Sequence, residues 1–106
     1  AIGSPGATRI FPTVAQVISN VIDFGFPIQE AILAPRLFQA ASGDLHLEGR
    51  YPVSALDGIK KLGHNVSIHG DWDSYFGGVH AVLYDYDKGL LYGGADPRRD
   101  GQAAAF

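Results

Sequence analysis

The sequence predicts one α+β segment, residues 1–106, in which helices pack on a mostly antiparallel sheet. Its 106 residues leave room for a single core. With 46% hydrophobic and 18% charged residues, the chain has the composition of a folded protein rather than a disordered or membrane-spanning one. Segments with helical periodicity are interspersed with segments that alternate like strands, an order typical of helices layered on a sheet.

The chain opens with the apolar pair Ala1-Ile2 and then a turn, Gly3-Ser4-Pro5-Gly6. Small or β-branched apolar residues directly before a Gly/Pro turn indicate the tail of a buried strand. The chain has no Met at its start or anywhere else. We therefore expect that its N-terminus arises from processing, truncation or removal of a tag.

Three segments have the apolar spacing of amphipathic helices. The strongest covers residues 8–24, where apolar residues recur every three or four positions up to Gly25. A shorter helix is expected over 28–34, after Pro27 and before a second proline. Residues 52–62 form the third candidate, with glycine directly after it as a C-terminal cap.

The strands are expected in two groups, one in the middle of the chain and one in its last third. A hairpin is predicted around the turn at 41–43, and a second around Asp87-Lys88-Gly89. The expected strands are 36–39, 44–48, 66–68, 78–86 and 90–93. His80 lies within one of them, where a packed or hydrogen-bonded core histidine is a better interpretation than a general base.

Charge and cysteine content exclude several classes of function. Eight Lys and Arg against 11 Asp and Glu give a formal net charge of -3, which offers no electrostatic footprint for nucleic acid or an anionic membrane surface. Without cysteine there is no disulfide, thiolate metal site or cysteine nucleophile. We therefore expect no nucleic-acid partner and no membrane partner.

The glycine turn between the first strand and the strongest helix is a candidate anion cradle. Unpaired backbone N–H groups and the positive end of a helix dipole meet at such a position. The phosphate-binding Walker pattern is absent, because no Lys-Ser/Thr pair follows Gly6. A plain tight turn, with Ser4 or Thr8 as the helix N-cap, fits the sequence equally well.

Two polar clusters are weaker candidates. His69, Asp71 and Asp73 could be imagined as a metal cluster, but the surrounding turn residues favour a solvated loop. The segment Asp96-Pro97-Arg98-Arg99-Asp100 is interpreted as surface charge in preference to a buried Asp/Arg bridge. The remaining histidines, His46 and His64, lie far apart and form no ligand pair in sequence.

Eight short motifs, in order along the whole chain, resemble the C-terminal part of the small subunit of the gamma-glutamyltranspeptidase family. They are Gly3-Ser4-Pro5-Gly6, Arg9-Ile10, Val21-Ile22-Asp23-Phe24-Gly25, Glu30-Ala31, Ala34-Pro35-Arg36, Leu62-Gly63-His64, Gly78-Val79-His80-Ala81 and Gly94-Ala95-Asp96-Pro97-Arg98. Any one of them alone would be unspecific, whereas the set is specific.

The resemblance implies a fold and a mechanism. Members are N-terminal nucleophile (Ntn) hydrolases with an αββα sandwich, made as a precursor that cuts itself into a large and a small subunit and exposes a Thr. That Thr attacks a γ-glutamyl amide, forms an acyl-enzyme and passes the acyl group to water or an amine, without a cofactor or metal. Expected partners are the remainder of the small subunit, the large subunit and a γ-glutamyl small molecule, as in glutathione metabolism. Ala1 has no hydroxyl, so the isolated chain is expected to be inactive.

The resemblance also assigns site residues. Two successive backbone N–H groups in the family's glycine turn stabilise the oxyanion, and they correspond to Gly6 and Ala7 here. The family usually has Gly at the second position, so Ala7 departs from the pattern and raises the question of positive φ. Leu37-Phe38 is a second departure, because members often have a His after Ala-Pro-Arg. Groups that grip the substrate's glutamyl moiety are expected outside this chain.

Two rival interpretations remain. Related chemistry on the same scaffold, as in beta-lactam acylases, poly-γ-glutamate cleavage or oxamate amide hydrolysis, has the same mechanism. A rival of another class is an autonomous α+β module that binds an anion or is purely structural. An excised segment would expose apolar edges and form homo-oligomers, whereas an autonomous module would stay monomeric. A periplasmic or extracellular location is the family-level expectation, with the cytoplasm as the alternative.

Overall fold

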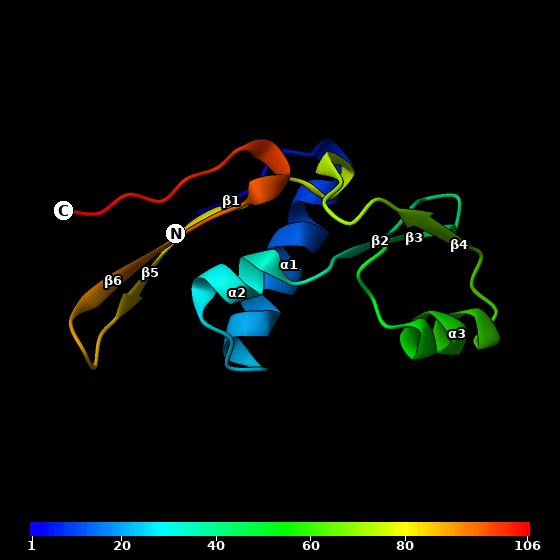
Figure 1. The fold of residues 1–106 in the computed structure, drawn as a ribbon, viewed down its shortest axis with the longest axis horizontal. Helices are drawn as coiled ribbons and strands as arrows, with labels where there is room; N and C mark the ends of the chain where they lie inside the picture. The colour runs from blue at the N-terminus through cyan, green and yellow to red at the C-terminus, as the bar shows by residue number, and fades with distance from the viewer.

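The computed structural model describes residues 1–106 and contains two three-stranded sheets joined by helices (Figure 1). The strand orders are β1-β5-β6 in the first sheet and β2-β3-β4 in the second. The elements are β1 (Ile2–Gly3), η1 (Ala7–Arg9), α1 (Ile10–Ile22), α2 (Ile28–Leu33), β2 (Leu37–Gln39), β3 (Leu45–Glu48), α3 (Val53–Lys61), β4 (Val66–His69), η2 (Ser74–Phe76), β5 (His80–Asp85), β6 (Leu90–Ala95) and η3 (Pro97–Arg99).

The first sheet confirms the expected opening strand and the expected C-terminal hairpin. β5 pairs antiparallel with β6 through the turn that ends at Gly89, whose φ of 66° is in the left-handed region that glycine tolerates. On its other side β5 pairs antiparallel with β1, with Ile2 opposite Ala81. Residues 1–3 are thereby tied to a strand about eighty positions away in the chain.

The second sheet contains the predicted hairpin and one parallel pair that was not predicted. β2 and β3 pair antiparallel, whereas β3 and β4 run parallel with Leu45 opposite Val66. Parallel neighbours need a crossover connection, and α3 provides it. The overall expectation of a mostly antiparallel arrangement is confirmed, but the strands form two sheets.

All three predicted helices are present within a few residues of their expected limits. Residues 7–9 form a 3₁₀ turn before α1, so the regular helix begins at Ile10 rather than Thr8. α1 contains no charged residue, and its apolar stripe places Val17 in the core. The prolines at 27 and 52 stand directly before α2 and α3, where a missing N–H costs nothing.

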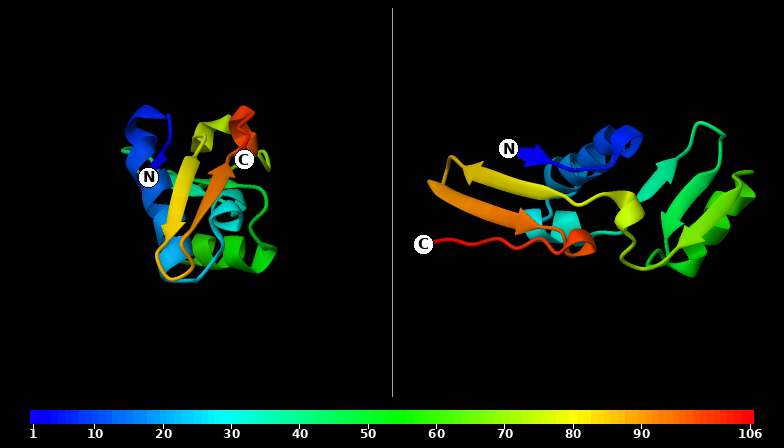
Figure 2. Two further views of the ribbon diagram at one scale, coloured as in Figure 1. Left: turned by 90° about the vertical axis from the view of Figure 1, so that its left-hand side faces the viewer. Right: turned by 90° about the horizontal axis from the view of Figure 1, so that it is seen from above.

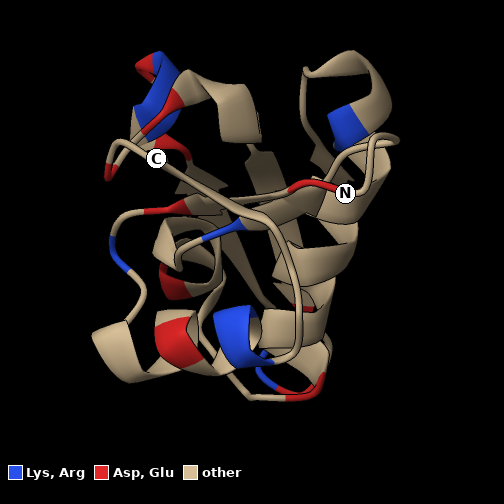
Figure 3. Ribbon diagram, turned by 90° about the vertical axis from the view of Figure 1, so that its right-hand side faces the viewer, with Lys and Arg blue, Asp and Glu red and all other residues tan.

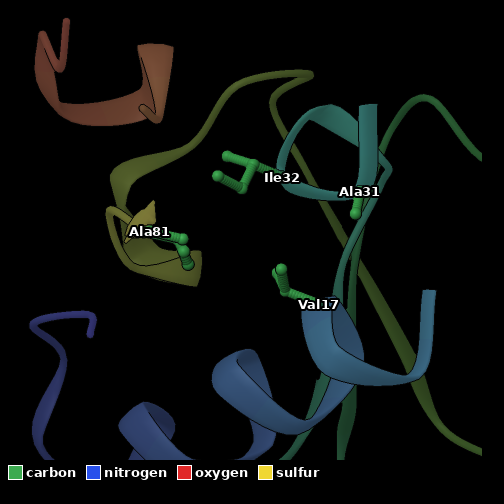
Figure 4. Packing of buried hydrophobic residues seen from close by; sticks show 5 residues of the cluster. Val17, Ala31, Ile32 and Ala81 are labelled. Atoms are coloured by element: carbon green, nitrogen blue, oxygen red, sulfur yellow. The ribbon is translucent and has the colours of Figure 1, made fainter. Parts of the chain in front are cut away.

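The main core lies between α1, α2 and one face of the first sheet. Val17, Ala31, Ile32, Val79 and Ala81 form it, and Ile2, Val21 and Ile28 pack around them. Figure 4 shows Val17 of α1, the Ala31 and Ile32 side chains of α2, and Ala81 converging on one space. Val79, directly before β5, and Ala81 of β5 therefore face the core.

The molecule is elongated, and much of its apolar surface is open. Its principal extents are 47 × 24 × 21 Å, with the two sheets toward opposite ends (Figure 2). Only 17 of 106 residues are buried, and large side chains such as Phe11, Ile22 and Leu91 are more than two-thirds exposed. No helix is both long and apolar enough to span a membrane. Positive and negative residues are interspersed on the face shown in Figure 3.

Candidate active-site turn and its supports

The glycine turn presents two backbone amides that have no partner within the chain. Gly6 has φ 136° and ψ 15°, and Ala7 has φ 51°. The turn is closed by the Arg9 amide, which donates to the Gly6 carbonyl over 2.9 Å. Neither the Gly6 nor the Ala7 amide is a donor in the turn and loop hydrogen bonds. Ala7 is exposed and Gly6 is half-buried.

The expected side-chain N-cap is not formed. No side chain caps η1 or α1. The Ser4 hydroxyl instead donates to the Pro5 carbonyl over 2.9 Å and accepts from the Gly78 amide over 3.2 Å. The interpretation of Ser4 or Thr8 as the helix N-cap is therefore wrong. Ser4 is used to attach the turn to a distant loop, which leaves the first amides unpaired.

Ala7 occupies a conformation that glycine adopts more readily. Its φ of 51° lies in the left-handed region, where the Cβ of an L-residue crowds the following carbonyl. The sequence pattern raised this question because the family usually has glycine at the position. The turn keeps its positive φ with alanine in place.

A loop from residue 73 to residue 78 packs against the glycine turn. Arg9 donates from Nε to the Tyr75 carbonyl over 2.7 Å and places its guanidinium 4.2 Å from the centre of the Tyr75 ring. Thr13 donates to the Phe76 carbonyl over 3.2 Å. A Cβ at Gly77, which has φ 90°, would collide with Ser4 Oγ. The turn and this loop therefore fit each other closely.

His46 and His69 form a pair next to that loop, a contact that was not predicted from the sequence. His46 Nδ1 and His69 Nε2 are 2.9 Å apart, and His69 Nδ1 lies 3.1 Å from Asp73 Oδ2. The Tyr75 ring stacks on His69 at 4.6 Å between centroids. The Tyr75 amide hydrogen bond and contact with His69 outweigh partial burial and lower the pKa of Asp73.

The candidate metal cluster is not assembled by these residues. His69 and Asp73 meet, but no group of three or more His, Asp or Glu side chains converges. The loop does contain turns, yet Asp73 serves as the N-cap of η2 by accepting from the Tyr75 amide over 2.8 Å. Of the other histidines, His64 is exposed. His80 is also exposed, so its expected place in the core is wrong, although its Nδ1 lies 3.2 Å from the Gly78 carbonyl.

A buried ionic network lies between the turn's supports and the second sheet. Arg36 Nη1 lies 2.7 Å from Asp96 Oδ2, and Arg98 pairs with Asp96 at 3.0 Å and with Glu48 at 2.6 Å. Glu48 and Asp96 have no exposed surface. Burial alone would raise the pKa of Asp96, but the Val79 amide and the two arginines outweigh it, and the pKa is lowered.

This network corrects the interpretation of residues 96–100 as surface charge. Asp96 and Arg98 form the buried bridge that was the less favoured alternative. Arg98 also donates to the carbonyls of Ile32 and Ala34, at the C-terminal end of α2. Glu48 was missed altogether, because its residue type in a short strand gives no sign of the arginines it meets.

Comparison with known proteins gives the class of the molecule. Cephalosporin acylase from Bacillus halodurans matches with a TM-score of 0.91 and 32% identity, over 99% of this chain and 19% of that chain. An acivicin-inhibited gamma-glutamyltranspeptidase matches with a TM-score of 0.80 and 37% identity, over 94% of this chain and 53% of that chain. The fold is that part of an Ntn-hydrolase sandwich in which helices pack on mostly antiparallel strands.

Sequence comparison gives the family. The model of the gamma-glutamyltranspeptidase family matches residues 1–106, and the chain belongs to that family. Acylase ACY 1 proenzyme of Pseudomonas sp. (strain V22) is 39% identical over 100% of this chain and 18% of its own length. The glutathione hydrolase-like YwrD proenzyme of Bacillus subtilis (strain 168) is 35% identical over 98% of this chain and 21% of its own length. The chain thus spans about a fifth of these relatives, which are proenzymes.

Proposed function

We propose that this chain is the C-terminal portion of a gamma-glutamyltransferase or hydrolase-like enzyme and supplies the oxyanion donors of its active site. The nucleophile is an N-terminal Thr in the small subunit, outside this chain. The Gly6 and Ala7 amides bind the negatively charged oxygen of the intermediate. The observation that supports this most directly is a pair of adjacent amides without internal acceptors, in a turn with positive φ at both residues.

The chemistry follows from those two donors. Attack of the Thr oxygen on an amide carbonyl moves negative charge onto the carbonyl oxygen. Two N–H groups held in place before the reaction stabilise that charge without reorganisation, and each is worth about 3 kcal/mol in comparable sites. The intermediate then expels the amine and leaves an acyl-enzyme, which water or an acceptor amine resolves through a second oxyanion at the same donors.

The isolated chain would be inactive in this scheme. Neither of the chain's main surface depressions, of about 350 and 500 Å³, includes Gly6 or Ala7 among its lining residues. The rest of the small subunit and the large subunit would supply the opposite wall of the active site. They would also supply the catalytic base and the groups that recognise the γ-glutamyl substrate. We place the whole enzyme in the periplasm or outside the cell, in keeping with its family.

The sharpest test removes the N–H of Ala7 and keeps its side chain, while the Gly6 carbonyl that accepts from the Arg9 amide becomes a weaker, ester acceptor. Proline at position 7 is a poor choice, because its fixed φ near −65° conflicts with the 51° of Ala7 and would rebuild the turn. Replacing Ala7 with lactic acid in the full-length protein converts the amide to an ester. We expect acylation by γ-glutamyl-4-nitroanilide to slow by about 10²- to 10³-fold.

The same ester at Ala41, an exposed position in another turn, is the matched control and should leave acylation unchanged. Unaltered turnover by the position-7 ester would show that Ala7 is not a donor. The precursor must be tested for cleavage as well, because self-cutting passes through an oxyanion of the same kind.

A second candidate function has the same mechanism but acts on a different acyl group. The acylase relatives, including the 39% identical proenzyme and the structure with a TM-score of 0.91, favour a related Ntn amidohydrolase or acylase. Oxamate amidohydrolase proenzyme of Klebsiella pneumoniae, 33% identical, points the same way. Comparing kcat/KM of the full-length protein on γ-glutamyl-4-nitroanilide, a cephalosporin side-chain amide and oxamate separates the two candidates.

A further inference from the structure

The loop that supports the glycine turn is built around an aromatic ring that no step of the proposed mechanism uses. The Tyr75 ring contacts both the guanidinium of Arg9 and the His69 ring, which lie 4.2 Å and 4.6 Å from its centroid. Its own carbonyl accepts from Arg9 Nε, and its amide donates to Asp73. Backbone and ring of this one residue therefore contact both the turn and the histidine pair.

Arg9 links Tyr75 to the candidate oxyanion donors. The Arg9 amide closes the turn by donating to the Gly6 carbonyl, so a shift of Arg9 shifts the peptide that contains the Ala7 amide. The Arg9 Cβ is also the nearest non-neighbouring atom to a Cβ built on Gly6, at 3.6 Å. The direction of the two amides therefore depends on where Arg9 is held.

The histidine pair also packs against the Tyr75 ring. His69 Nδ1 lies 3.1 Å from Asp73 Oδ2, and His69 Nε2 lies 2.9 Å from His46 Nδ1, so both nitrogens of the His69 ring have a polar partner. The His46 ring itself lies 5.2 Å from Tyr75. Because β3 and β4 carry these histidines, the second sheet is connected through the ring to the turn at the start of α1.

We propose that Tyr75 and Arg9 are positioning residues that hold the Gly6 and Ala7 amides in the direction needed for oxyanion binding, with His46 and His69 as the rigid backing. This inference rests on the proposed function. A displacement of reacting groups by about 1 Å can cost about 10²-fold in rate, so contacts several residues away from the donors have measurable effects.

The test compares Tyr75→Leu with Tyr75→Phe in the full-length enzyme. Leucine removes the flat ring that contacts Arg9 and His69, whereas phenylalanine keeps it. We expect Tyr75→Leu to lower kcat at least about tenfold, with KM changed less than about twofold, and Tyr75→Phe to be close to wild type. Oxyanion stabilisation acts on the transition state, which is why the effect belongs in kcat.

Tyr51→Leu is the matched control for loss of a half-buried tyrosine away from the turn. Tyr51 donates to the Pro35 carbonyl over 3.0 Å and contacts neither Arg9 nor the histidine pair. It should lower the unfolding midpoint without lowering kcat. An equal fall in kcat for Tyr51→Leu and Tyr75→Leu, or an unchanged kcat in Tyr75→Leu, would overturn the positioning role.

Two further variants test the positioning role if Tyr75→Leu alone cannot. If Tyr75→Leu does not fold or mature, Arg9→Lys keeps the charge and removes the Nε contact; a wild-type kcat in that variant overturns the proposal. Combining Tyr75→Leu with the lactic-acid ester at position 7 should lower kcat by less than the product of the two separate effects, because only the Gly6 donor is then left to be displaced. An ester without effect refutes the donor function itself, whereas an effective ester with an ineffective Tyr75→Leu refutes only the positioning.

Discussion

Ala7 carries backbone strain that a single substitution can remove. A non-glycine residue in the left-handed region costs roughly 1–2 kcal/mol, and a glycine gives back about half of that through the flexibility of the unfolded chain. With φ at 51°, Ala7→Gly should therefore stabilise the full-length protein by about 0.5–1 kcal/mol. Urea unfolding midpoints of the two proteins measure the difference.

Ala15→Gly is the control for the same change of residue. Ala15 is exposed in the middle of α1, where its backbone is helical, and glycine there should destabilise by about 0.5–1 kcal/mol. A destabilising Ala7→Gly would mean that the surrounding contacts, and not the residue, hold the turn in its positive-φ conformation without strain.

For single residues, the sequence predicted the features that depend on residues adjacent in the chain. It missed the features that depend on tertiary contacts. The turn at Gly6 and Ala7 follows from its glycine and proline content and its place before a helix. The role of Ser4 could not be predicted, because its partner Gly78 is 74 positions away. The His46–His69 contact likewise needs two strands to pair before the rings meet.

Among the elements, α2 depends on the arginines that bind its C-terminal carbonyls. Arg98 donates to the Ile32 and Ala34 carbonyls and neutralises Glu48 and Asp96. Removing one partner of a buried pair leaves a carboxylate without compensation, which costs about 3–5 kcal/mol. Arg36 and Arg50 still contact these carboxylates, so we expect Arg98→Met to cost about 3 kcal/mol in chemical unfolding.

Lys60→Met on exposed α3 is the comparison, since it removes a cation that has no ion pair in the structure. It should leave the unfolding midpoint nearly unchanged. If Arg98→Met were equally harmless, the network would contribute specificity of packing rather than stability, as some buried ion pairs do.

The helices and hairpins were predictable from periodicity because each is specified by residues close in sequence. α1 has an apolar stripe over thirteen residues, and the predicted limits of 8–24 were off by two residues at each end, at the start because the first turn is 3₁₀. The parallel pairing of β3 with β4 was not predictable, because β4 has four residues and no hairpin turn to set its direction. Short strands take their partners from the fold around them.

For the whole molecule, an open apolar groove predicts how the isolated 106-residue chain behaves. The groove lies between α1 and the β1–β5 edge and is lined entirely by apolar or aromatic residues, among them Ile18, Ile22, Val82 and Tyr84. These four side chains are 41–75% exposed. Apolar patches of this kind mark surfaces that pack against other polypeptide, and a net charge of -3 provides little repulsion between copies.

We therefore expect the isolated chain to self-associate at micromolar concentration, with a light-scattering mass above that of one chain. Ile22→Lys, on the rim of the groove, should shift the population toward monomer, because a charge there cannot be buried against a second copy without a partner. Val53 is also apolar and is 73% exposed, but it lies on α3, away from the groove. Val53→Lys should therefore leave association unchanged. A monomeric wild-type chain with one sharp unfolding transition would instead favour an autonomous module, since only a core that is complete within these residues unfolds cooperatively alone.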